Sequence, residues 1–91
     1  GAVADAIGRR LKRLSGKVQV LTVTHAPQVA ARADTHLYIE KQSIAAGAFV
    51  RTEVRPLDGP TRKEEIARML AGARITEEAR AAAGKLLSDV A

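Results

Sequence analysis

Hydrophobic and polar positions divide the chain into one apolar run, two alternating stretches and three stretches with helical spacing. The apolar run occupies residues 18–23 and is interrupted only by Gln19 and Thr22. A run rich in β-branched residues that does not alternate is typical of a strand covered on both faces, as in parallel α/β sheets. The sequence therefore predicts a buried strand here. Pro27 suits the first position of a short helix over residues 27–33, with Val29, Ala30 and Ala33 facing inward.

Residues 36–41 and 48–55 alternate between apolar and polar side chains, which predicts two half-exposed strands. In the first, Leu37 and Ile39 share one face, and Tyr38 and Glu40 share the other. With residues 42–47 as a loop, the two stretches predict an antiparallel hairpin at the edge of a sheet. The charges on its outer face are typical of an edge protected against addition of another strand.

Three stretches have the spacing of amphipathic helices. The first covers residues 2–14 and ends at Ser15 and Gly16; the second follows the turn Asp58-Gly59-Pro60 and ends at Gly72; the third starts at Thr76. In the second, Thr61 and Glu64 have the spacing of a capping box, and Glu64 is expected to pair with Arg68. The last two helices are expected to pack as an antiparallel pair against the sheet. The predicted buried stripes are Val3, Ala6, Ile7, Leu11 and Leu14; then Ile66, Met69, Leu70 and Ala73; then Ala79, Ala83, Leu86, Leu87 and Val90.

Composition indicates that the chain is part of a larger unit. It has 91 residues, of which 46% are hydrophobic but only 2% aromatic, so its core must consist of small aliphatic side chains. Such a core buries little apolar area against the conformational entropy of folding. One buried strand beside a hairpin also cannot complete a parallel sheet. We therefore expect the α/β fold of the C-terminal portion of a larger domain, with residues 1–91 forming no separate domains.

Charge and residue types exclude several classes of function. The chain has no cysteine, so disulfides, thiolate metal sites and cysteine nucleophiles are ruled out. No metal-ligand spacing, paired-carboxylate pattern or glycine-rich phosphate loop occurs. No apolar run approaches the length of a membrane span, and we expect a cytoplasmic protein. The net charge of +5 permits attraction to phosphates without specifying a partner.

His25 is the strongest candidate for chemistry. It follows the predicted strand, and ligands of open α/β sheets bind at the carboxyl ends of the strands. An imidazole there can hydrogen-bond a bound phosphate or an attacking water. Thr24 is a weaker candidate, because threonine is also a common strand residue. His36 begins a strand on its polar face, so exposure is expected.

Four further stretches are informative together. They read THAPQVA from Thr24 with Ala33-Asp34 and His36 beyond it, VRPL from Val54, EEIARMLAG from Glu64, and GAVADAIG from Gly1. These stretches resemble the RecN family, bacterial DNA-repair ATPases related to the SMC proteins. The first resembles the histidine-switch segment of that family, the second and third its C-terminal segment, and the last the helix after its D-loop.

The resemblance implies part of an ABC/SMC-type, P-loop ATPase head that hydrolyses ATP with Mg²⁺ in repair of DNA double-strand breaks. It implies that His25 reaches the γ-phosphate and helps to position the attacking water, and that Gly1 and Ala2 lie close to the head-to-head interface. Thr24, beside His25, stays a weaker candidate for cofactor binding from its position alone. The implied partners are the N-terminal part of the same head, a second head across ATP, and DNA near the nucleoid. The Walker A loop, signature motif, Walker B carboxylates and coiled coil are not in this sequence. We therefore expect no ATP binding or hydrolysis by this chain alone.

A basic nucleic-acid-binding module without catalytic activity is the alternative. Arg9, Arg10, Lys12 and Arg13 cluster on the first predicted helix and would supply the phosphate contacts. The aromatic-poor composition and the absence of a recognisable reading helix argue against this interpretation. Cations near the C-terminus of a helix also have a simpler explanation, because they interact favourably with its dipole.

Overall fold

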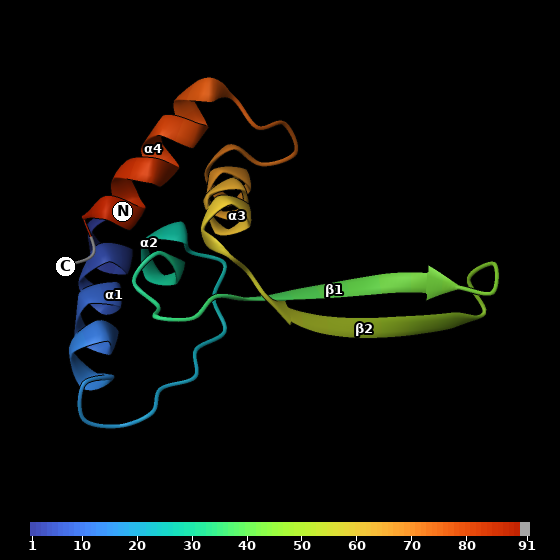
Figure 1. Ribbon diagram of the computed structural model, residues 1–91, viewed down its shortest axis with the longest axis horizontal. Coiled ribbons are helices and arrows are strands. Elements are labelled where there is room, and N and C mark those ends of the chain that lie inside the picture. Colours follow the sequence, from blue (N-terminus) through green and yellow to red (C-terminus); the bar gives the residue numbers. More distant parts are fainter. Residues whose placement is uncertain (90–91) are drawn as a thin grey trace.

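The computed structural model describes residues 1–89, which form four helices and one two-stranded sheet. The helices gather on one side, and the hairpin of β1 (Leu37–Ile44) and β2 (Phe49–Pro56) extends away from them (Figure 1). Val90, predicted at the end of the last stripe, lies outside the described residues. No helix within residues 1–89 is long and apolar enough to cross a membrane. The elements in chain order are α1 (Ala2–Leu14), α2 (Pro27–Ala30), β1 (Leu37–Ile44), β2 (Phe49–Pro56), α3 (Gly59–Ala71) and α4 (Glu77–Ser88).

Helix α1 confirms the predicted helix but not the burial of its stripe. Its bounds are those expected, and Ser15 follows as the C-cap. Val3, Ile7 and Leu14 are nevertheless exposed, and the buried residue of the helix is Gly8. The apolar face of α1 is therefore mostly uncovered, because the helix packs on α2 only around Gly8.

The buried strand predicted over residues 18–23 is wrong for this chain. The segment is irregular, and the sheet within residues 1–89 contains only β1 and β2. Leu21 is 84% exposed and Val23 is 86% exposed, although Val20 is partly covered. A strand needs neighbours to satisfy its backbone N–H and C=O groups, and here the hairpin pairs only with itself.

The predicted antiparallel hairpin is confirmed, with a first strand longer than expected and a second strand shifted by one residue. Its register runs from Leu37 opposite Pro56 to Ile44 opposite Phe49, so residues 42–44 belong to β1 and not to the loop. The turn is confined to residues 45–48. Ala45 and Ala46 adopt φ values of 52° and 55° there, in the left-handed region that costs a non-glycine residue energy.

The two faces of β1 are buried in the opposite sense to the prediction. Leu37 and Ile39 were expected to face inward, yet both are exposed. Tyr38 and Glu40 are half-buried instead. The guanidinium of Arg55 lies 4.9 Å from the centre of the Tyr38 ring and 3.1 Å from Glu40 Oε2, so it covers this face. The apolar face of the hairpin is left open.

Helix α3 starts earlier than predicted and uses a different cap. Asp58 is the N-cap: Asp58 Oδ1 accepts from the Thr61 amide at 2.9 Å, and Thr61 Oγ1 accepts from the Asp58 amide at 3.0 Å. Thr61 is therefore the third helical residue rather than the cap of a box with Glu64. The helix ends before Gly72, whose φ of 84° confirms the predicted glycine stop.

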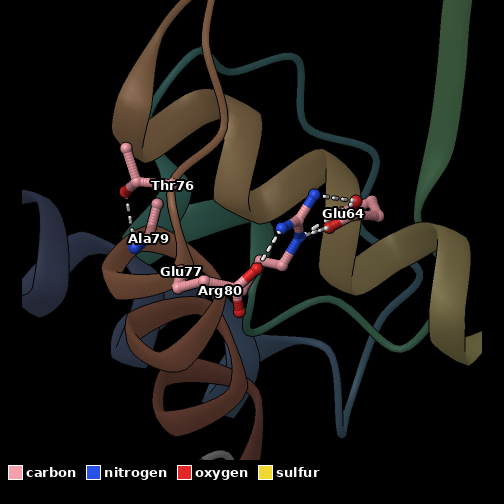
Figure 2. A network of polar contacts seen from close by, with 5 residues as sticks. All are labelled: Glu64, Thr76, Glu77, Ala79 and Arg80. Atoms are coloured by element: carbon pink, nitrogen blue, oxygen red, sulfur yellow. Dashed lines mark hydrogen bonds and ion pairs between the residues drawn. The ribbon is translucent and has the colours of Figure 1, made fainter.

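Helices α3 and α4 form a helical pair, as predicted, and Arg80 joins them (Figure 2). The expectation that the pair packs against the sheet is wrong, because its buried side chains meet those of α2. Arg80 Nε donates to Glu64 Oε2 at 3.0 Å, and Arg80 Nη1 donates to Glu77 Oε1 at 2.5 Å. Thr76 caps α4 by accepting from the Ala79 amide at 3.1 Å. The expected pair of Glu64 with Arg68 is wrong, since Arg68 donates to Glu65 within α3.

The core is small and lies between α2, α3 and α4. Ile66 is the largest side chain in it that is fully buried. Met69, Ile75, Leu86 and Leu87 pack around the core without being fully covered, whereas Leu70, Ala73 and Ala33, all predicted to face inward, are exposed. The expectation of a core built from small aliphatic residues is confirmed. Its other buried members are Ala30, Ala31, Ala67, Ala79 and Ala83.

Candidate functional site

His25 lies on the turn that leads from the exposed apolar segment into α2. Thr24 Oγ1 accepts from the Ala26 amide at 3.0 Å, which bends the backbone on either side of His25. The carbonyl of Ala26 then accepts from the amides of Val29 and Ala30 and opens α2, with Pro27 at its start. The His25 side chain is exposed. The hydroxyl of Thr24 stabilises the turn by this hydrogen bond, a local role that the sequence did not indicate.

His25 and Thr24 line an open cavity of about 830 Å³. Its walls come from α1, residues 20–25, α2, the base of the hairpin and α3. The lining is largely apolar and includes Val20, Leu37, Ile39, Val54 and Met69, with His36, Glu65 and Arg68 as polar members. This volume is typical of ligand sites in proteins. Gly1 and Ala2 do not line the cavity and lie at the exposed start of α1.

Helix α1 holds α2 in place through a glycine contact and two ion pairs. A Cβ on Gly8 would lie 2.9 Å from the carbonyl oxygen of Gln28 and 3.3 Å from Val29 Cα. Arg32 Nη2 donates to Asp5 Oδ1 at 3.2 Å, and Lys12 donates to Asp34. The hydrogen bond from Lys12 lowers the pKa of Asp34. The helix that follows the candidate histidine is thus fixed against α1.

Replacing Gly8 by alanine should destabilise the chain by about 1–3 kcal/mol, because the new methyl group overpacks against backbone that cannot rotate away. Urea unfolding followed by circular dichroism measures the loss. Gly84→Ala is the matched control: its Cβ meets only the flexible end of Lys63, at 3.4 Å, and removing a helix-interior glycine is favourable. Equal stability of the two variants would contradict the close packing of α1 on α2.

His36 is half-buried, which corrects the expectation that it is exposed. Its Nδ1 is buried and has no hydrogen-bond partner within residues 1–89. Burial lowers the pKa of His36, the charge of Arg62 lowers it further, and Glu65 raises it in part. The ring therefore favours its neutral form in the folded chain.

This pKa shift predicts loss of stability on mild acidification. The unfolded chain, with a His36 pKa near 6.5, binds the proton more tightly than the folded chain does. The contribution of neutral His36 to the stability of the folded chain is therefore fully present above pH 6.5. It declines as the pH falls toward the lowered pKa of His36 in the folded chain. Thermal melting between pH 7.5 and 5.5 should show a falling midpoint, and His36→Gln should flatten the profile. A wild-type slope retained by His36→Gln would disprove this origin.

The basic cluster of α1 is partly neutralised by neighbouring carboxylates. Arg9 Nε donates to Asp5 Oδ2 at 3.0 Å, and Lys12 pairs with Asp34. Two of the four cations proposed for phosphate contact are thus held by acidic side chains. The positive charge that this cluster can offer to phosphates is therefore lower than the sequence suggests. Within residues 1–89, no group of three or more His, Asp or Glu side chains is placed to hold a metal ion.

Curated relatives match nearly the whole chain. It is 48% identical over 99% of its length to the DNA repair protein RecN of Xylella fastidiosa strain Temecula1. It is 49% identical over 96% of its length to RecN of Halalkalibacterium halodurans, and 47% identical over 96% of its length to RecN of Rickettsia felis. The chain spans only about 16% of the length of these relatives. No protein-family profile matches it.

Proposed function

The chain is a relative of one segment of the DNA repair protein RecN, and we propose from this premise that it is the C-terminal part of an ATPase head that acts in DNA repair. The observation that carries the proposal is the exposed apolar segment at residues 18–23, which runs directly into the exposed His25. A sequence suited to a central strand, left uncovered beside a largely apolar cavity, is what a head domain presents without the rest of its sheet.

His25 is proposed as the switch histidine of that head. Its imidazole is exposed on the rim of the cavity, and its backbone is fixed by the Thr24 turn and by α2. An imidazole so placed can hydrogen-bond a terminal phosphate and orient the attacking water. ATP with Mg²⁺ supplies the phosphoryl group, and residues outside this chain would cradle it. Thr24 orients the turn in this proposal.

The partner of the open surface is the N-terminal part of the same head. The uncovered apolar side chains belong to three elements that face the cavity or lie beside it: the segment at 18–23, the hairpin and α1. Strands from the missing part would pair with the first of these and cover the other two. Gly1 and Ala2, at the free end of α1, would then lie toward a second head, and DNA is the substrate of the assembled protein.

Reconstitution tests the proposed function. The isolated chain should hydrolyse no ATP above background, and addition of the N-terminal part of the protein, in trans or as a fusion, should restore turnover. The control is the N-terminal part alone, which lacks His25. If the N-terminal part hydrolyses ATP equally well with and without this chain, the chain is not part of the catalytic head.

A further inference from the structure

Arg62 reaches from α3 to the far end of α2, the helix that begins two residues after His25. Its Nη2 donates to the carbonyl oxygens of Ala30 and Ala31, each at 3.2 Å, and of Ala33 at 2.5 Å. These carbonyls close α2 and the turn after it. Carbonyls at a helix end lack partners within their own helix, and a cation there also complements the helix dipole. Arg62 therefore acts as the C-terminal cap of α2, supplied from a distant part of the sequence.

Helix α2 depends on such external contacts because it has only four residues. A helix this short does not persist in water by its own hydrogen bonds. Gly8 and the pair of Asp5 with Arg32 hold it from the side of α1. Arg62 holds it from the side of α3, where the guanidinium is partly buried.

The contact is relayed to His25 through the backbone. The carbonyl of Ala26, next to His25, accepts from the amide of Ala30 at 3.0 Å, and the carbonyl of Ala30 accepts from Arg62. Only one turn of helix therefore separates the Arg62 guanidinium from the backbone of Ala26, which follows His25 and helps to set the orientation of its imidazole. Loss of the cap would free this turn and let His25 sample other orientations.

We propose that Arg62 is a positioning residue for His25: by capping α2 it fixes the imidazole for the reaction without touching the reacting atoms. The inference rests on the proposed function of His25. It assigns the start of the C-terminal helical pair, α3, a direct part in setting the geometry of the ATPase site.

The test is a double-mutant cycle in the longer protein. Arg62→Met keeps the aliphatic stem and removes the donors, and we expect kcat to fall at least 10-fold with little change in the KM for ATP. Arg62→Lys, which retains donors and charge, should recover part of the loss. In a His25→Ala background Arg62→Met should have almost no further effect, because the ring that it orients is gone. Lys63→Met, one residue along α3, is the control for general damage to the helix.

A second measurement on the 91-residue chain separates structure from catalysis. Arg62→Met should accelerate amide hydrogen exchange of Ala30 and Ala31 at least 10-fold and leave the exchange of α4 unchanged. If Arg62→Met lowers kcat by the same factor with and without His25, or leaves exchange in α2 unchanged, the positioning role is overturned. If His25→Ala itself leaves turnover intact, the proposed function fails instead, and exchange in α2 still shows whether Arg62 caps the helix.

Discussion

Replacing His25 by alanine in the longer protein is expected to slow ATP turnover by about 10²–10⁴, the range typical of a group that transfers a proton or orients the nucleophile. The imidazole is exposed and makes no packing contact in the core that its removal would disturb. The loss should therefore appear in kcat at saturating ATP while the melting temperature stays unchanged. Steady-state phosphate release measures turnover, and His36→Gln at pH 8 serves as the control for loss of a histidine near the same cavity. Unchanged turnover in His25→Ala at saturating ATP would refute the role.

Replacing Leu21 by aspartate should leave the stability of the isolated chain almost unchanged but strongly destabilise the longer protein. In the isolated chain Leu21 is almost fully exposed, so the substitution should change stability by no more than about 0.5 kcal/mol. In the longer protein the same position would lie in a covered strand, where an unpaired carboxylate costs about 3–5 kcal/mol. Chemical unfolding of both forms measures the difference.

Ala48→Asp is the matched control for this comparison, because it places the same charge in the exposed turn of the hairpin. It should be tolerated in both contexts. A longer protein that accepts Leu21→Asp as easily as Ala48→Asp would show that the apolar segment is not a buried strand in any context.

Local sequence signals predicted the elements that depend on neighbours close in the chain. The spacing of apolar residues identified α1, α3 and α4, and alternation identified the hairpin, because these patterns follow from the geometry of one helix or of one pair of strands. The cap of α3 was misassigned because Asp58 and Thr61 both suit it, and only the backbone shows which residue comes first. The prediction of a strand at residues 18–23 was wrong because it depends on neighbours distant in the chain. Its pattern describes a strand with neighbours on both sides, and residues 1–89 supply none.

The candidate site likewise contains residues that a local pattern reveals and residues whose role depends on distant contacts. His25 was predicted from a local pattern, an apolar run followed by a turn and a proline, and the structure places it at the start of α2 beside the cavity. Its catalytic role stays a prediction. Arg62 was missed because its contacts are to backbone carbonyls about 30 residues away. Every residue has a backbone carbonyl, so no sequence pattern marks the partners of Arg62. The environment of His36 was likewise missed, because the charges of Arg62 and Glu65 that act on it belong to α3, distant in the sequence.

Amide hydrogen exchange of residues 18–23 in the isolated chain and in the chain joined to the N-terminal part of the protein decides whether this segment belongs to a shared sheet. In the isolated chain the amides should exchange at nearly the rate of an unfolded peptide. After joining, they should become protected to the same degree as the core of α3 around Ile66. Exchange that stays fast in the joined protein, with ATP turnover nonetheless present, would contradict the assignment of this chain to the ATPase head.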